Sequence, residues 1–103
     1  MAQEYKVVIR DKARADIDNI FLYYYYRSLN LEVAQGVVNR ILSTAFGLSF
    51  MPYTRPMILE YNNPNYRKSI CGEYVIPFVM NNDTKTVTVS RVFHGKSNYQ
   101  KYL

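Results

Sequence analysis

Two kinds of apolar spacing divide this chain, and that division constrains its fold more than any other feature. Apolar side chains recur every three or four residues through 13–48, which is the period of helices with one buried face. Residues 66–93 instead form three short stretches rich in Val, Ile, Tyr and Phe, and residues 5–10 form another. This order predicts an α+β fold in which a helical hairpin packs on a mainly antiparallel four-stranded sheet.

Polar residues mark the expected helix boundaries. Asp11 follows the first strand and is expected to cap the first helix, and Asn30 is expected to cap the second. Gly36 lies inside the second helix, where glycine costs about 1 kcal/mol relative to alanine, so we expect the packing there to tolerate or require a small residue. Residues 51–65 contain three prolines and are expected to be irregular.

Turn residues divide the C-terminal part into three predicted strands, at 66–71, 74–80 and 86–93. In the last of these, alternation places Val87 and Val89 on one face and Val92 on the other. Pro77 lies inside the middle strand and has no N–H to donate. That strand is therefore expected to be an edge at this position or to carry a bulge.

Length and composition limit the class of protein. The chain of 103 residues fits one domain spanning 1–103, and its 49% of apolar residues can supply a core. The formal net charge of +5 favours an anionic partner, either a nucleic acid or an acidic protein segment. No stretch reaches the roughly 18 apolar residues of a membrane helix, and no signal peptide is recognised. We therefore expect a cytoplasmic protein without a membrane partner.

Positive charge concentrates toward the C-terminal end. Residues 1–65 hold seven Lys/Arg and six Asp/Glu, whereas 66–103 hold six Lys/Arg against only two acidic residues.

The single cysteine, Cys71, cannot form an intrachain disulfide, and its apolar neighbours favour a buried, unreactive thiol. With one histidine and no phosphate-binding glycine loop, we expect neither a metal nor a cofactor.

The residues that could carry chemistry gather on and after the predicted strands, with one in the preceding loop. They are Glu60, Arg67, Lys68, Arg91, His94, Lys96, Tyr99, Lys101 and Tyr102. Neighbouring strands lie about 4.8 Å apart, so side chains on one face can converge. Such a set could cleave RNA without a metal. Tyr99, Tyr102 or Glu60 would take the proton of the ribose 2′-hydroxyl, arginines would stabilise the transition state, and His94 or an arginine would protonate the leaving oxygen.

Each of these groups also has a purely structural interpretation. His94 precedes a glycine and fits a hydrogen-bonded turn residue. Arg67 and Arg91 could be held in internal ion pairs with carboxylates. Tyr99 and Tyr102 could belong to an apolar tail that packs on the sheet.

Short blocks in a fixed order resemble the RelE/ParE superfamily of toxins from type II toxin–antitoxin systems, which includes plasmid stabilisation proteins. The blocks are Ala13-x-x-Asp16-Ile17-x-x-Ile20, Asn39-Arg40-Ile41, Pro52-x-x-Arg55-Pro56, Tyr66-Arg67, Tyr74-x-Ile76-x-Phe78 and Val89-x-Arg91-Val92-Phe93-His94-Gly95. The resemblance implies a strand–helix–helix–three-strand fold. It also implies a cognate antitoxin that covers the toxin; such antitoxins are often acidic, which suits the basic C-terminal third.

The superfamily holds two activities on one fold, so the fold does not choose between them. RelE-like members cut mRNA in the ribosomal A site with basic residues and a C-terminal Tyr or His, whereas ParE-like members poison DNA gyrase. Arg67, Arg91, His94 and a terminal tyrosine match the nuclease pattern in type, and Glu60 resembles the carboxylate base of some members. Ribosome-dependent mRNA cleavage is therefore our narrowly preferred hypothesis, with RNA or partner contacts from Lys68, Lys96 and Lys101.

Gyrase inhibition by protein contact stays open as the alternative. The block from Arg91 to Gly95 and the region from Pro52 to Pro56 look closer to ParE-like sequences. A protein of this kind would not be an enzyme. A non-toxic binding domain that kept the fold is a third possibility.

Overall fold

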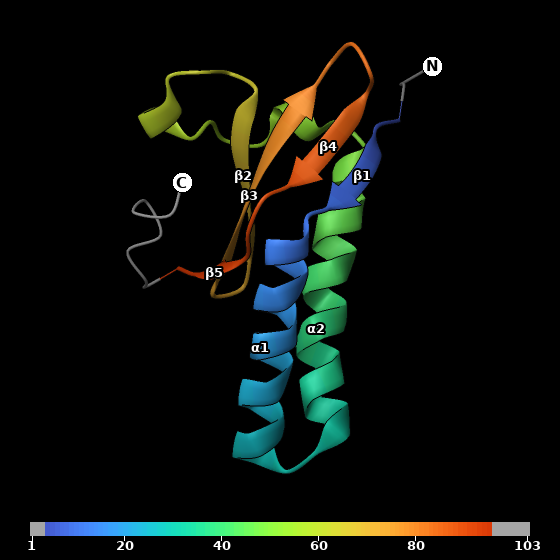
Figure 1. Ribbon diagram of the computed structural model, residues 1–103, viewed down its shortest axis with the longest axis vertical. Coiled ribbons are helices and arrows are strands. Elements are labelled where there is room, and N and C mark those ends of the chain that lie inside the picture. Colours follow the sequence, from blue (N-terminus) through green and yellow to red (C-terminus); the bar gives the residue numbers. More distant parts are fainter. Residues whose placement is uncertain (1–3, 96–103) are drawn as a thin grey trace.

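The order of elements predicted from the sequence is confirmed by the computed structural model, which describes residues 4–95. The elements are β1 (Lys6–Ile9), α1 (Asp11–Ser28), α2 (Leu31–Phe46), β2 (Tyr66–Cys71), β3 (Tyr74–Asn81), β4 (Thr86–Val89) and β5 (Phe93–His94). The two helices form a long hairpin, and much of that hairpin projects beyond the end of the sheet (Figure 1). The molecule therefore has a sheet end and a free hairpin end.

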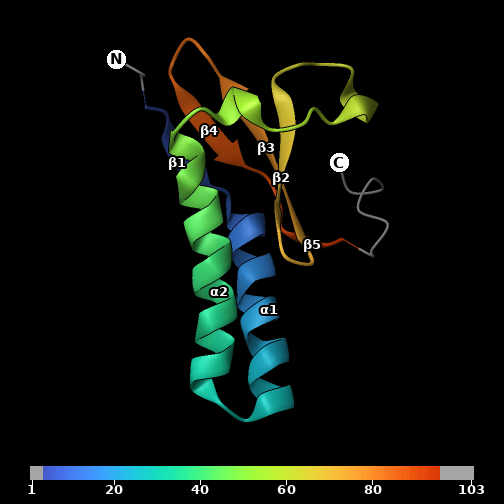
Figure 2. The ribbon, with the colours of Figure 1, turned by 180° about the vertical axis from the view of Figure 1, so that it is seen from behind.

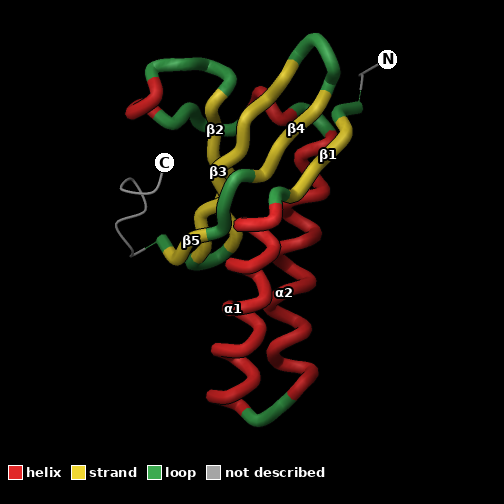
Figure 3. The backbone as a smooth tube through the Cα atoms, viewed as in Figure 1, coloured by secondary structure: helices red, strands yellow, loops and turns green. Residues whose placement is uncertain are grey.

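The sheet has the strand order β1-β4-β3-β2, and β5 pairs with β3 beyond the end of β4. β1 runs parallel to β4, whereas β4, β2 and β5 all run antiparallel to β3. The mainly antiparallel sheet is confirmed, and it has five strands where four were predicted. Figure 3 shows the loop that separates β4 from β5.

The prediction of one continuous strand over 86–93 is wrong. β4 ends at Val89, residues 90–92 lie outside any strand, and β5 begins at Phe93. Val92 belongs to the same buried core as Val87 and Val89, although simple alternation placed it on the opposite face. The interruption therefore shifts the alternation by one residue and places Val92 on the face that points toward the helices.

Pro77 accounts for the position of this interruption. β3 is a central strand, and Pro77 accepts a hydrogen bond from the Ser90 N–H at 3.0 Å but has no N–H to return. On the other side Pro77 faces Lys68 of β2 in the register. The prediction of a local edge or bulge thus holds only on the β4 side, where the ladder stops.

The core lies between the hairpin and one face of the sheet. Alternate residues of β3 and β4 point toward the helices, and Phe78, Ile76 and Val87 are fully buried. Ile17 of α1 and Ile41 of α2 pack into the same cluster. Burying one such side chain contributes about 1.5–3 kcal/mol. Figure 2 shows the upper end of the hairpin beside β1. Among residues 4–95, neither α1 nor α2 packs on the opposite face of the sheet, which we call the helix-free face.

The helix caps differ from one another. Asn30 caps α2 as predicted, because its side chain accepts a hydrogen bond from the Glu32 N–H at 2.9 Å. Asp11 is not the cap of α1, which was the expectation; Arg10 holds that position, and Asp11 is the first helical residue. The helix starts one residue earlier because the Arg10 carbonyl already accepts the Arg14 N–H at 3.0 Å. No helix within residues 4–95 is both long and apolar enough to cross a membrane.

Candidate functional site

Arg67 of β2 is held by the loop that precedes it. Its Nε donates to the Pro64 carbonyl at 2.8 Å, and its Nη1 donates to the Arg55 carbonyl at 2.7 Å. Met57 also forms an isolated bridge with Arg67. These contacts fix the loop against the edge of the sheet, so two N–H groups of this guanidinium hold the loop in place.

Arg91 is held by a carboxylate of α1. Its Nε lies 2.7 Å from Asp16 Oδ2 and its Nη2 lies 3.0 Å from Asp16 Oδ1, a paired geometry that strengthens the contact. The Val92 N–H donates to the same Oδ2 at 2.9 Å. The guanidinium also lies 4.6 Å from the centre of the Phe93 ring. Asp16 therefore satisfies both the side chain and the backbone of the segment between β4 and β5.

His94 lies at the far end of β3. Its Nε2 is 3.5 Å from the Glu73 carboxylate, and its ring makes an edge contact with Tyr74 at 5.6 Å between centres. The register pairs His94 with Tyr74 but pairs Arg67 with Phe78, on the other side of β3. Four residues of strand span about 13 Å. The structure thus places Arg67, Arg91 and His94 in three separate settings.

The other predicted site residues are scattered or lie outside the described part. Glu60 is exposed in a short helical turn at Leu59–Tyr61. Lys68 of the edge strand β2 lines a hollow beside Ser43 and Thr44 of α2. The remaining predicted residues, which are Lys96, Tyr99, Lys101 and Tyr102, lie outside residues 4–95.

A different group of cationic and phenolic side chains does come together, on the helix-free face. It lines a cleft of about 420 Å³ formed by Arg10, Asp11, Lys12, Tyr61, Tyr66, Val79, Ser90 and Arg91, which we call the open-face cleft. The rings of Tyr61 and Tyr66 stack with centres 4.3 Å apart. Burial, and secondarily the neighbouring Tyr66, raises the pKa of Tyr61.

Sequence reasoning missed this cleft. Arg10 and Lys12 directly follow β1, far along the chain from Tyr61, and nothing in their spacing points to a shared site. One signal was present: Tyr66, Val79, Thr88 and Val8 are register partners across four strands, so they share one face. Knowing the strand order would have placed Tyr66 and the end of β1 on that face.

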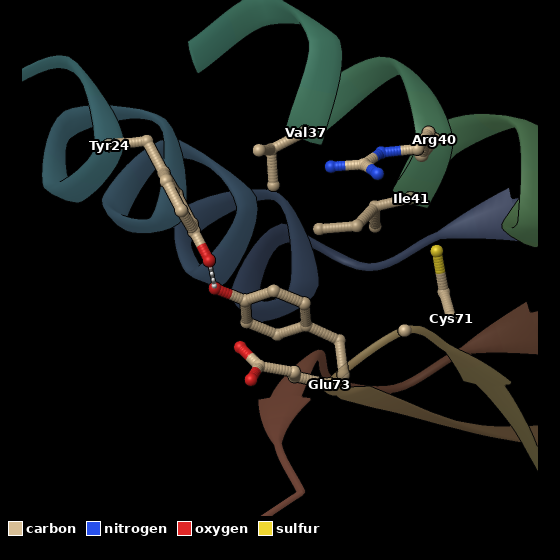
Figure 4. Close-up of a pocket in the computed structure, with 8 residues that line it drawn as sticks. Tyr24, Val37, Arg40, Ile41, Cys71 and Glu73 are labelled. Atoms are coloured by element: carbon tan, nitrogen blue, oxygen red, sulfur yellow. Dashed lines mark hydrogen bonds between the residues drawn. The ribbon is translucent and has the colours of Figure 1, made fainter. Parts of the chain in front are cut away.

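A second hollow lies between α2 and the β2–β3 turn. It encloses about 260 Å³ and is lined by Tyr24, Val37, Arg40, Ile41, Cys71, Gly72, Glu73 and Tyr74. Figure 4 shows the Arg40 guanidinium and the Cys71 thiol on either side of Ile41. The Tyr74 hydroxyl donates to the Tyr24 hydroxyl at 3.3 Å. Burial, and then this hydrogen bond, raises the pKa of Tyr74 well above its usual range.

Two further hollows extend this one along the outer edge of β2. The next is lined by Asn39, Arg40, Ser43, Thr44, Cys71 and Gly72, and the last by Ser43, Thr44, Gly47, Arg55, Pro56, Lys68, Ser69 and Ile70. Successive hollows share lining residues, and we refer to the three together as the α2–β2 groove. Its lining has three cations, Arg40, Arg55 and Lys68, and one carboxylate, Glu73. Cys71, expected to be buried, is half-buried in this lining.

The free end of the hairpin exposes apolar side chains. Tyr26 is 69% exposed and Leu29 is 77% exposed, and their neighbours add to the patch. The patch consists of Leu22, Tyr23, Tyr26, Leu29, Leu31 and Val33, which we call the hairpin-end patch. Exposed apolar patches of this kind mark contact surfaces more often than single exposed residues do.

Within residues 4–95 no group of three or more His, Cys, Asp or Glu could hold a metal ion.

A family model described as the ParE toxin of the type II toxin–antitoxin system parDE matches residues 7–99. A chain from a chromosomal ParDE system of P. aeruginosa has a similar structure, with a TM-score of 0.73 and 19% identity over 90% of this chain and 98% of that one. A chain of the RelBE2 toxin–antitoxin complex of Mycobacterium tuberculosis has a TM-score of 0.64 and 21% identity, over 88% and 91%. No curated protein matches. At these identities the two structures establish a shared fold.

Proposed function

Because this chain belongs to the ParE toxin family of type II toxin–antitoxin systems, we propose that it arrests growth by protein contact with DNA gyrase rather than by cutting RNA. One observation carries this choice. The three groups that a RelE-like site would need, Arg67, Arg91 and His94, are engaged in separate internal contacts. The activity that needs no acid–base set therefore fits the geometry better than the nuclease activity that the sequence alone narrowly favoured.

The hairpin-end patch is the surface we assign to the target. It projects away from the sheet (Figure 1), so a large partner can reach it without meeting the rest of the toxin. The stretch from Asn19 to Asn39 carries only two charged residues, Arg27 and Glu32. Aromatic side chains such as Tyr26 supply large contact area at interfaces and often dominate binding energy.

The antitoxin is assigned a different surface, the α2–β2 groove. Its cations Arg40, Arg55 and Lys68 complement an acidic segment, and complementary charge speeds and orients association. Ile70 is 57% exposed beside the groove on an edge strand. Open edges of this kind are usually covered, and a bound antitoxin segment would cover it.

The test measures both candidate activities on one purified protein. A gyrase supercoiling and DNA-cleavage assay is run beside primer extension on mRNA translated in vitro. We expect loss of supercoiling or accumulation of DNA breaks, and no new mRNA ends. Leu29→Asn should weaken the gyrase effect, because it removes an apolar contact and asparagine tolerates the left-handed backbone at that position (φ 52°). Leu59→Asn is the matched control, since Leu59 is also 77% exposed but lies elsewhere.

Other results would decide between the alternatives. New mRNA ends that depend on His94, Arg67 and Arg91, without any effect on gyrase, would replace this proposal with RNA cleavage. Unchanged growth on expression without an antitoxin would indicate a binding domain that kept the fold and lost the activity.

A further inference from the structure

The open-face cleft shares no lining residue with either surface assigned above. Two of its walls come from the sheet, where Tyr66 and Val79 are register partners on the helix-free face. The third wall is the start of α1, with Arg10 and Lys12, and the fourth is Ser90 and Arg91 after β4. Four segments distant in the sequence thus meet around about 420 Å³ of space.

The charge of the cleft is positive. Arg10 and Lys12 are exposed, and within residues 4–95 no ion pair joins either of them to a carboxylate. Arg91 also lines the cleft, but its charge is matched by Asp16. Asp11 is the one carboxylate of the lining, so Arg10 and Lys12 leave an excess of one positive charge for an anion.

An aromatic surface lies beside these cations. Tyr61 is 37% exposed and stacks at 25° on Tyr66, so its ring is supported from one side. A ring held in this way presents its outer face and edge at little entropic cost, because a neighbour already restricts its rotation. Stacking on such rings is how proteins hold unpaired bases without reading their sequence.

Cations, a supported aromatic ring and hydroxyl groups in one cleft match the parts of a nucleotide. We propose that the open-face cleft binds a nucleotide, with its phosphate at Arg10 and Lys12 and its base against the Tyr61–Tyr66 pair. Asp11 and Ser90 supply an acceptor and a hydroxyl for the sugar. The nucleotide is either free or part of a single strand; both present the same chemistry. This inference goes beyond the proposed function, because it concerns a ligand of the toxin itself and not its target.

The experiment is a binding titration of the purified full chain by NMR and fluorescence anisotropy. The probes are AMP and UMP, a short single-stranded oligonucleotide, and inorganic phosphate. We expect shifts of the amide signals that line the cleft and affinity that falls as salt is raised. The double variant Arg10→Gln, Lys12→Gln and the single variant Tyr61→Leu should each weaken binding about tenfold.

The controls carry the same chemical changes at the hairpin end. Arg27→Gln and Tyr26→Leu remove an exposed cation and an exposed ring far from the cleft, and they should leave nucleotide affinity unchanged. Saturation by mononucleotides would identify a free nucleotide as the ligand, and binding of the oligonucleotide alone would identify a strand. Equal loss in the controls, binding of inorganic phosphate as tight as that of nucleotides, or no binding of any probe would overturn the inference. None of these outcomes depends on whether gyrase is the target.

Discussion

Asp16 of α1 accepts both parallel hydrogen bonds of the Arg91 guanidinium, at 2.7 and 3.0 Å, and so joins the hairpin to the interrupted last strand. The side chains are 15% and 27% exposed, which places the pair between a surface ion pair and a buried one. Removing one partner of such a pair is costly, because the other partner is then left poorly solvated and unpaired.

The first prediction concerns this pair. Asp16→Asn should lower the free energy of unfolding by about 1–3 kcal/mol, because it leaves a half-buried guanidinium with a weaker partner. Urea denaturation measures the change. Asp18→Asn, an exposed position of the same helix, should cost little. An equal loss in the two variants would show that helix charge, and not the contact with Arg91, is responsible.

A second prediction concerns the glycines. A methyl group at Gly36 meets no atom within 4 Å, so of the two expectations for this position the packing tolerates a small residue and does not require one. Gly36→Ala should stabilise the protein by about 0.5–1 kcal/mol through helix propensity. Gly72 also has open space but a φ of 57°, so Gly72→Ala should instead destabilise. Thermal melts of the two variants, moving in opposite directions, would check both.

A third prediction concerns alkaline pH. The folded protein holds the pKa of Tyr74 above the usual value of about 10, chiefly through burial. The unfolded chain loses that proton first, so the stabilisation is complete below pH of about 10 and is lost as the pH rises toward the folded pKa. Tyr74→Phe should flatten the decline of urea midpoints between neutral and alkaline pH. The exposed substitution Tyr26→Phe should leave the wild-type profile; a profile that Tyr74→Phe does not change would contradict the assignment.

A fourth prediction concerns the α2–β2 groove. Reversing two of its charges, with Arg40→Glu and Arg55→Glu, should weaken binding of an acidic antitoxin by roughly tenfold or more, chiefly through slower association at low salt. The probe is the product of the adjacent open reading frame, co-expressed and then titrated by calorimetry. Arg14→Glu reverses an exposed cation of α1 that does not line the groove. If that variant weakens binding as much as the groove variants do, net charge and not the groove controls affinity.

Local chemistry was enough to predict most elements. The bounds of β2 are as predicted because Gly72 with its positive φ ends the strand, and the Asn30 cap works through its own side chain. The break after Val89 was not predictable from its own residues, because it depends on Pro77 in a neighbouring strand and on Asp16 in α1. Both partners are distant in the sequence.

The candidate site was predictable only in the type of its residues. Arg67 and Arg91 were identified as phosphate-binding candidates, but their partners, a pair of loop carbonyls and a helix carboxylate, appear only once the chain is folded. The cleft around Arg10 and Tyr61 escaped notice for the same reason, since strand order brings its walls together. The residue type determines which chemistry a side chain can perform, and its contacts in the folded chain determine whether it is available for that chemistry.

The parallel pairing of β1 with β4 has a consequence for synthesis. In this pairing Lys6 lies opposite Thr86 and Ile9 lies opposite Val89. During translation β1 is made first, and β4 can pair with it only after almost the whole described chain has left the ribosomal exit tunnel. Contacts this distant form late, and until then the nascent chain lacks the finished sheet. The complete sheet, and with it the open-face cleft that Ser90 and Arg91 help to line, can therefore form only after nearly all of the described chain has been made.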